Sequence, residues 1–280
     1  VIQVMSRKIY TDALTSLTKG TDAGLYRMIP KRVEVIRSEE ELIEALAACA
    51  AAGEPVTFKA GGTSLSGQTI TDSVLLEIDP DFGESRIEQN GRLATFPCGI
   101  TGVEANRRLK PYHRKLGPSP ASIQSAKIGG IVSNNASGSS YGIRYNSYHT
   151  LRSMVFILAD GTRVDTASTA SREAFKQSHA ALCAQLLALR QEIWANEPMR
   201  SRIQQKYELK NTCGYAMNAF LDFEDPVDML MHLLVGSEGT LGFISSVTFE
   251  TVPDEALKAS ALIYFPNLVE ACRAIGPLRQ

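Results

Sequence analysis

The pattern of apolar and polar positions in the first third of the chain predicts a unit of short strands and one helix. The sequence Val-Glu-Val-Ile at 33–36 is typical of a short strand. It precedes apolar residues at helical spacing between Ser38 and Gly53, where the serine and a glutamate three residues later form a capping box. Two further β-rich runs follow at 56–58 and 74–78. This order predicts a small parallel βαβ unit.

Hairpin and helix patterns dominate the rest of the chain. Asn90-Gly91 and Asp160-Gly161 are turn dipeptides between apolar runs, so hairpins are expected at 86–96 and 154–166. Amphipathic spacing and capping residues predict, in order, helices at 101–109, 180–194, 199–207 and 225–234, strands at 243–251 and 261–265, and a helix at 268–275.

The order of these elements predicts an α+β fold with two subdomains, a small parallel βαβ unit and a larger, mostly antiparallel sheet flanked by helices. Residues 1–30 are weakly patterned, and we expect them to form an N-terminal arm. Residues 31–253 are expected to form the main domain, with subdomains at about 31–80 and 81–253. One strand and one helix cannot form a domain, so we interpret residues 254–280 as the start of a truncated substrate or cap domain.

Composition narrows the class of protein. The chain has 280 residues, is 44% hydrophobic and 21% charged, and carries a formal net charge of −1. This balance is typical of a globular protein and argues against nucleic acid or an anionic membrane as the main partner. No apolar run approaches the ~18 residues that a membrane span needs. The five cysteines lack CxxC pairs and the four histidines lack metal-ligand spacing, so we expect a reduced, cytoplasmic protein without a metal site.

A glycine-rich segment at 58–69, FKAGGTSLSGQT, lies between two predicted strands. Because glycine lacks a Cβ, the backbone N–H groups of such a loop can surround an anion, with serine and threonine hydroxyls as further donors. Gly62 and Gly67 have P-loop spacing, but Gln68 stands where the phosphate-binding lysine belongs, and a strand follows instead of a helix. We therefore expect a phosphate or pyrophosphate site. An ordinary surface loop and a magnesium-dependent nucleotide site remain alternatives.

Two more glycine-rich segments follow. Residues 117–146 form a polar stretch that is too long for a connector yet contains isoleucine, valine and tyrosine, which favours a functional loop over disorder. Residues 236–242 read GSEGTLG and lead into the strand predicted at 243–251. Between these two segments lies the polar motif KNTCGY at 210–215.

Taken in order, the motifs AGGTSLSGQT, IGGIVSNNASG, KNTCGY and VGSEGTLGFISSVTFETVP resemble the flavin-binding half of the vanillyl-alcohol oxidase/p-cresol methylhydroxylase superfamily. The resemblance covers roughly residues 21–253 and is greatest to the FAD-linked D-lactate, glycolate and D-2-hydroxyglutarate dehydrogenases. It implies a nucleotide-binding flavoprotein with the two-subdomain FAD-binding fold. The first segment would hold the pyrophosphate of FAD, and the other two would lie along the flavin and the adenosine.

The resemblance also implies which residues contact the cofactor. They are Ala60, Gly61, Gly62, Thr63, Ser64, Leu65, Ser66, Gly67, Gln68, Pro118, Ser122, Ser125, Gly129, Gly130, Asn134, Ser137, Gly138, Glu238, Gly239, Gly242 and Ile244. Part of the superfamily attaches its flavin through a histidine near the first segment. Thr63 stands in this loop and no histidine does, so we expect FAD to be bound non-covalently.

The reaction implied by the resemblance is oxidation of a small D-2-hydroxy acid, with hydride transfer to flavin N5. A substrate carboxylate needs a cation, and the hydroxyl proton needs a base. Lys210, Asn211 and Arg144 are the candidates in this chain. In relatives, a cap domain and a histidine-rich C-terminal motif supply much of the site, and neither is present here. An alternative is therefore a non-catalytic FAD-binding subunit that acts beside a partner chain, as in glycolate-oxidase-like complexes.

Overall fold

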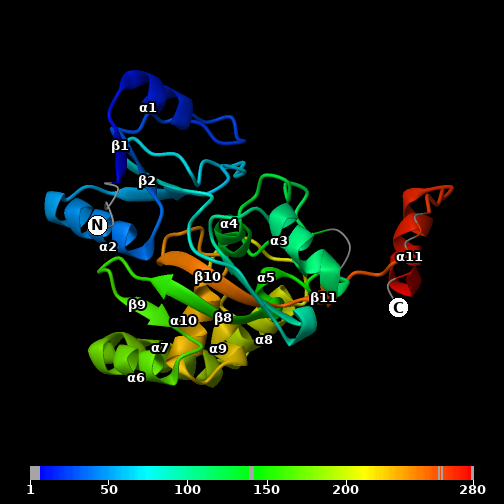
Figure 1. Cartoon of the computed structure of the whole chain (residues 1–280). Helices are drawn as coiled ribbons and strands as arrows, with labels where there is room; N and C mark the ends of the chain where they lie inside the picture. Colours follow the sequence, from blue (N-terminus) through cyan, green and yellow to red (C-terminus); the bar gives the residue numbers. More distant parts are fainter. Residues whose placement is uncertain (1–6, 139–141, 258, 260, 279–280) are drawn as a thin grey trace.

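The structure, a computed structural model, describes residues 7–138, 142–257, 259 and 261–278 (Figure 1). Among these residues there are two main sheets, one of four strands and one of five, and a short two-stranded ribbon. Figure 1 shows the smaller sheet with its helices in blue and cyan, and the larger sheet below it with a layer of helices. The predicted α+β class with two subdomains is confirmed.

The smaller sheet contains the predicted βαβ unit. Strand β2 (Arg32–Ile36), helix α2 (Glu39–Ala52) and strand β3 (Val56–Lys59) follow one another, and β4 (Val74–Ile78) pairs in parallel with both strands. The Ser38 side chain caps α2 by accepting a bond from the backbone N–H three residues later at 3.2 Å. The C-terminal ends of β3 and β4 lie at one edge of the sheet, where the first glycine-rich segment begins.

Residues from the predicted N-terminal arm extend this sheet. Strand β1 (Lys8–Tyr10) pairs antiparallel with β2, so the sheet is mixed and not wholly parallel as the βαβ pattern predicted. Helix α1 (Ala13–Lys19) follows. The Lys59 ammonium, at the end of β3, donates to the backbone carbonyls of Lys19 at 2.8 Å and Thr21 at 2.5 Å. Lys59 thereby attaches these residues to the edge where the glycine-rich segment begins.

The larger sheet is antiparallel, with β10 (Phe243–Glu250) at its centre. This strand pairs with β6 (Leu93–Pro97) on one side and with β8 (Leu151–Ile157) on the other. The outer strands are β5 (Arg86–Glu88) and β9 (Arg163–Asp165). Both predicted hairpins and the predicted strand at 243–251 are therefore confirmed.

The turn of the first hairpin differs from the prediction. The two-residue turn expected at 90–91 is wrong, because Glu88 pairs with Leu93 and four residues lie between them. The short 3-10 helix η1 (Gln89–Gly91) occupies this loop, with positive φ at each of its residues. The backbone N–H of Thr251 donates to the carbonyl of the last loop residue at 3.0 Å. A distant part of the chain thus holds the wider loop.

Helices form where the amphipathic patterns predicted them. The confirmed helices are α3 (Gly102–Leu109), α7 (Ala180–Ala195), α8 (Glu197–Tyr207), α10 (Pro226–Leu234) and α11 (Leu268–Leu278). The elements that the patterns missed are mostly short: α4 (Ile128–Ser133), α5 (Ser147–Thr150), α6 (Thr169–Ser178), α9 (Ala219–Asp222), the 3-10 helix η2 (Lys110–Tyr112), and β7 (Arg114–Lys115), which pairs with β11 (Val252–Pro253).

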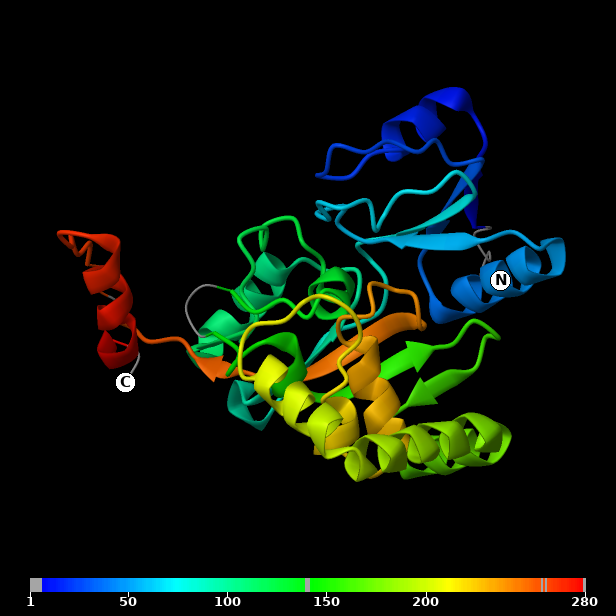
Figure 2. The same ribbon diagram turned by 180° about the vertical axis from the view of Figure 1, so that it is seen from behind.

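Two apolar clusters hold the layers together. Helices α6 to α10 lie on one side of the larger sheet (Figure 2), and Phe156 and Phe249 of the sheet share one cluster with Ile193 of α7. A second cluster joins the two sheets, since it contains Leu42 of α2 and Ile157 of β8. Helix α4 packs against β10 and β6. The edge that carries the first glycine-rich segment is therefore fixed against the larger sheet.

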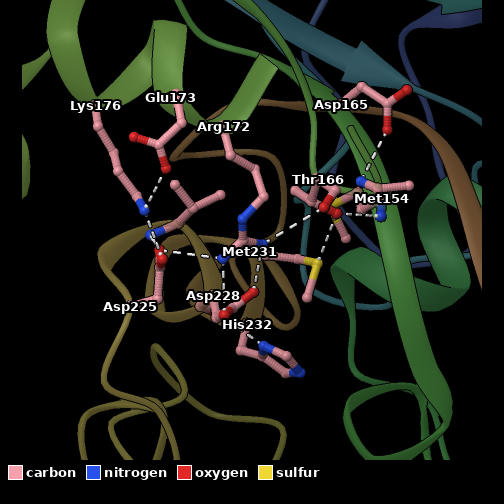
Figure 3. Close-up of polar contacts among 12 residues, drawn as sticks. Met154, Asp165, Thr166, Arg172, Glu173, Lys176, Asp225, Asp228, Met231 and His232 are labelled. Carbon is pink, nitrogen blue, oxygen red and sulfur yellow. Dashed lines mark hydrogen bonds and ion pairs between the residues drawn. The ribbon is translucent and has the colours of Figure 1, made fainter. Parts of the chain in front are cut away.

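An ion-pair network attaches α6 to the start of α10 (Figure 3). The Arg172 guanidinium forms a bidentate pair with Asp228 at 2.7 and 2.9 Å, and lies 3.2 Å from Asp225. Lys176 contacts the other oxygen of Asp225 at 2.7 Å. Asp225 also caps α10, because its side chain accepts from the N–H of Val227 at 2.8 Å. The helix layer is thus joined by charge as well as by apolar packing.

The predicted strand at 261–265 is wrong. These residues are exposed and adopt no strand, since they pair with no other strand among the described residues. Helix α11 forms as predicted, but none of its residues is buried. Figure 1 shows it in red, set apart from the two sheets.

Candidate cofactor-binding site

A cavity of about 460 Å³ lies where the three glycine-rich segments meet between the two sheets. Most of the predicted cofactor-contact residues line it. They are Ala60, Gly61, Gly62, Thr63, Ser64, Leu65, Ser66 and Gln68 of the first segment, Ser122, Gly129, Gly130 and Asn134 of the second, and Glu238, Gly239, Gly242 and Ile244 of the third. Segments far apart in the sequence therefore form one cavity wall.

The first segment presents bare backbone to this cavity. The N–H groups of residues 62–65 donate to no other described residue. Gln68, which replaces the lysine of a P-loop, instead closes the loop on itself. Its side-chain oxygen pairs with the Ser64 hydroxyl and accepts from the N–H of Ser66 at 3.2 Å. A run of unpaired N–H groups in a turn can bind an anion.

Close packing of the first two segments requires glycine. A Cβ at Gly61 would lie 2.3 Å from the carbonyl oxygen of Ser125, so any larger residue would push the loop away from the second segment. Gly129 is also tightly packed, since a Cβ there would lie 2.9 Å from the Cβ of Cys98. Gly130, by contrast, has only the Ala60 Cβ nearby, at 3.9 Å. Its missing side chain leaves open space in the cavity wall.

The third segment docks on the end of α4. The N–H of Gly236 donates to Val132 O at 3.1 Å, and the N–H of Glu238 donates to Ser133 O at 3.0 Å. Glu238 has a positive φ of 53°, and its carboxylate accepts from the Asn134 side chain at 2.7 Å. Burial raises the pKa of the Glu238 carboxyl above its ordinary value, against the opposing effect of this hydrogen bond. These contacts place a single acidic side chain at one end of the cavity.

The inner wall of the cavity is apolar. It consists of Phe58, Ile78, Cys98 and Phe243, and the rings of Phe58 and Phe243 pack with centroids 5.1 Å apart. Burial raises the pKa of the Cys98 thiol far above its ordinary value, so this side chain is neutral and acts as a small apolar group. A flat aromatic ligand fits against such a wall.

Five predicted contact residues do not line the cavity: Gly67, Pro118, Ser125, Ser137 and Gly138. Several of them support the residues that do. Ser125 supplies the carbonyl behind Gly61, and Gly138 lies against Ser119 with its own φ at 114°. The backbone carbonyl of Ser137 accepts from the N–H of Ser119 at 2.7 Å. Their direct contact with a cofactor stays a prediction.

The three candidate catalytic residues also lie outside the cavity lining. Arg144 is exposed, with its guanidinium 5.0 Å from the ring centroid of Tyr145. Lys210 is exposed, and Asn211 donates to the carbonyl of Cys213 at 3.3 Å. The next residues of the same motif, Thr212 and Cys213, do line the cavity. The KNTCGY motif therefore reaches the site, and the roles of the three residues remain predictions.

The sequence did not identify thirteen lining residues. They are Phe58, Thr69, Ile78, Cys98, Pro120, Ala126, Lys127, Ile131, Ser133, Ala136, Thr212, Cys213 and Phe243. Many are immediate neighbours of motif residues and could have been found by extending each motif by two positions. Ile78 and Cys98 carry no such signal, because apolar residues of this kind look like ordinary core.

A model of the FAD binding domain family matches residues 30–167. This region contains the first two glycine-rich segments and runs from β2 to β9. The match confirms the resemblance inferred from the motifs.

Three curated relatives match most of the chain at low identity. D-2-hydroxyglutarate dehydrogenase of Pantoea ananatis is 26% identical over 250 residues, covering 85% of this chain and 24% of that protein. D-lactate dehydrogenase of Archaeoglobus fulgidus is 24% identical, and the match covers 79% of this chain and 38% of that protein. Glycolate oxidase subunit GlcD of Bacillus subtilis is 21% identical, and the match covers 90% of this chain and 43% of that protein. The chain thus spans 24–43% of the length of these relatives.

Solved structures share the fold. An alkyldihydroxyacetonephosphate synthase superposes with a TM-score of 0.58 at 16% identity, covering 88% of this chain and 38% of that one. A glucooligosaccharide oxidase from Acremonium strictum, a protein with 6-S-cysteinyl, 8α-N1-histidyl FAD, superposes with a TM-score of 0.57 at 17% identity. The match covers 88% of this chain and 40% of that one. Within the described part of the chain, no helix combines the length and the apolar character that crossing a membrane requires.

Proposed function

We propose that this chain is the flavin-binding part of a dehydrogenase that oxidises a D-2-hydroxy acid of the lactate, glycolate or 2-hydroxyglutarate class. The chain carries an FAD binding domain of the vanillyl-alcohol oxidase/p-cresol methylhydroxylase type. The observation that carries the proposal is the convergence of the three glycine-rich segments on one cavity, with the unpaired N–H groups of residues 62–65 in its wall. The names of the curated relatives support the substrate class.

The residues present fit FAD. The cavity lies within the ~300–1,000 Å³ range of small-ligand sites. The unpaired N–H groups suit a diphosphate, and the wall containing Phe58 and Phe243 suits a flat ring. Thr69 lines the cavity, and its hydroxyl is buried without a hydrogen-bond partner among the described residues. A buried hydroxyl of this kind requires a ligand or a water molecule as its partner.

When bound, FAD supplies the chemistry by accepting a hydride from the α-carbon of the hydroxy acid. The residues of this chain hold and orient the cofactor, and the apolar wall excludes water from the ring. A cation must bind the substrate carboxylate, and a base must take the hydroxyl proton. Lys210, Asn211 and Arg144 are this chain's candidates, and the remaining length of the relatives is the other source.

We propose that FAD is held non-covalently, because no described residue lining the cavity is a histidine. Acid precipitation of the FAD-loaded protein is expected to release all flavin fluorescence into the supernatant. Fluorescence retained in the pellet would contradict this expectation, and it would implicate the lining thiols of Cys98 and Cys213.

Titration of the purified chain with FAD tests the main proposal. Flavin fluorescence is expected to be quenched with a 1:1 endpoint and the visible absorbance bands to shift. The proposal fails if neither signal changes on mixing.

The alternative proposal is a non-catalytic FAD-binding subunit, which the likeness to a glycolate oxidase subunit supports. The two proposals differ in one measurement. A catalytic chain loaded with FAD should reduce an artificial dye with D-lactate, glycolate or D-2-hydroxyglutarate, whereas a subunit of this kind should bind FAD and show no turnover alone.

A further inference from the structure

Lys127 is the one cationic side chain among the described residues that line the cavity. It directly precedes α4 and forms an isolated backbone bridge with Thr101. Its side chain crosses from the larger subdomain to the smaller sheet, where the ammonium donates to the carbonyl oxygen of Ile78 at the end of β4. Lys127 thus lies at the junction of the two subdomains.

The charge of Lys127 has no partner of opposite sign within 4 Å in the described part of the chain. The nearest carboxylates are engaged elsewhere, since Glu77 pairs with Lys19 at 2.6 Å and Asp79 lies 3.7 Å from Arg37. Burial lowers the pKa of Lys127 below its ordinary value, with Glu77 and Asp79 acting against this shift. An ammonium has three N–H donors, and the contact with Ile78 uses one. A partly desolvated cation with free donors is stabilised by an anion.

The carbonyl that holds the ammonium lies near the start of the first glycine-rich segment. Ile78 ends β4, the neighbour of the strand that leads into that segment. A Cβ at Gly61 would lie 2.3 Å from Ser125 O and 3.3 Å from the Cα of Ala126, the residue that precedes Lys127. The segment's own lysine, Lys59, does not line the cavity, because its ammonium is bound to two backbone carbonyls.

We propose that Lys127 is the cation that binds the diphosphate of the dinucleotide. The inference rests on the proposed function. Backbone N–H groups supply directed hydrogen bonds to a diphosphate but carry no net charge, and Lys127 supplies the missing positive charge. Since its ammonium also contacts β4, binding of the diphosphate strengthens the link between the two subdomains.

The test compares Lys127→Met with Lys31→Met. Methionine keeps most of the side-chain length and removes the charge in both variants. Lys31 is exposed at the start of β2, the opposite end of the same sheet, and does not line the cavity. Dissociation constants are measured by fluorescence quenching for FAD and for riboflavin, which lacks the diphosphate, and by calorimetry for ADP.

Lys127→Met is expected to weaken FAD and ADP binding about 10- to 100-fold, the loss of one charge-assisted hydrogen bond, and to leave riboflavin binding unchanged. Lys31→Met is expected to match the original chain. Equal weakening of FAD and riboflavin would overturn the inference, because it would place Lys127 at the ring. Unchanged FAD binding in Lys127→Met would also overturn it. If the original chain binds no FAD, the proposed function itself fails, and the inference fails with it.

Two measurements decide the matter if Lys127→Met does not fold. Lys127→Arg keeps the charge and is expected to bind FAD within about threefold of the original chain. In the unchanged protein, added salt is expected to weaken FAD binding and not riboflavin binding. Equal salt dependence for the two ligands would contradict a charge contact with the diphosphate.

Discussion

Individual glycines in the cavity wall have different roles that the bare sequence does not distinguish. In IGG, Gly129 is fixed by contact with Cys98, whereas Gly130 faces open space. The motif predicted both as cofactor contacts. Both line the cavity, but the first is also packed against Cys98, the residue that follows β6, whereas the second has open space beside it.

This difference predicts opposite effects of alanine at the two positions. Gly130→Ala adds a methyl group that meets no protein atom closer than 3.9 Å, and alanine favours a helix by about 1 kcal/mol over glycine. The free energy of unfolding without cofactor should therefore be unchanged or rise by up to ~1 kcal/mol, while FAD affinity should fall. Gly129→Ala, with a 2.9 Å contact, should be destabilised. Urea unfolding and FAD titration of the pair check this. A loss of stability in Gly130→Ala would contradict this prediction, because it would mean that the space beside Gly130 is filled by protein atoms.

Helices, strands and loops are held in place by contacts with residues far away in the sequence. A local sequence pattern therefore predicts some of these elements and misses others. The helices at 101–109, 199–207 and 225–234 have side-chain caps, and the helix at 180–194 has apolar residues at helical spacing, so the sequence placed all four correctly. The hairpin loop at 89–92 depends on Thr251, and the expected strand at 261–265 has no neighbour to pair with. Local pattern cannot supply either fact.

The network around Asp225 makes a pH-dependent prediction for α6 and α10. Burial raises the pKa of Asp225, but its contacts with Lys176 and Val227 outweigh this and lower it below the ordinary value of 3.8. A lowered folded-state pKa means that the stabilisation is fully present at pH 7. It is lost as the pH falls through and below 3.8.

Asp225→Asn keeps the helix cap and removes the charge. It should reduce the free energy of unfolding by about 1 kcal/mol at pH 7. The difference from the original chain should shrink as the pH falls below 3.8 and Asp225 itself becomes protonated. Glu224→Gln, at an exposed neighbour, is the control and should have little effect at any of these pH values. A difference that stays constant as the pH falls below 3.8 would argue against the charge as the cause.

The whole molecule places a small mixed sheet against a larger antiparallel sheet so that the cavity lies between them. Pattern and motif predicted both subdomains and the three segments. They missed the inner wall, because Ile78 and Phe243 meet only through the packing of one sheet on the other. The shared cluster containing Ile157 and Leu42 is the physical reason for expecting the subdomains to behave as one unit.

Cooperative unfolding of the two subdomains follows from this cluster. Ile157 is fully buried, and Ile157→Ala should cost about 2–5 kcal/mol. Trp194, the single tryptophan, reports on the helix layer, and mass-spectrometric labelling of buried Cys49 reports on α2. Both probes should give the same urea midpoint in the original chain and shift together in the variant. Leu186→Ala, which changes only the larger cluster, should also move both. Separate midpoints would mean independent subdomains.

The central claim is that one dinucleotide lies across all three glycine-rich segments. A crystal structure of the chain grown with FAD tests it most directly. The account predicts the diphosphate within hydrogen-bond reach of the N–H groups of residues 62–65 and of Lys127, with the ring against Phe58 and Phe243. A structure with FAD bound away from residues 62–65, or with its diphosphate in solvent, would contradict it.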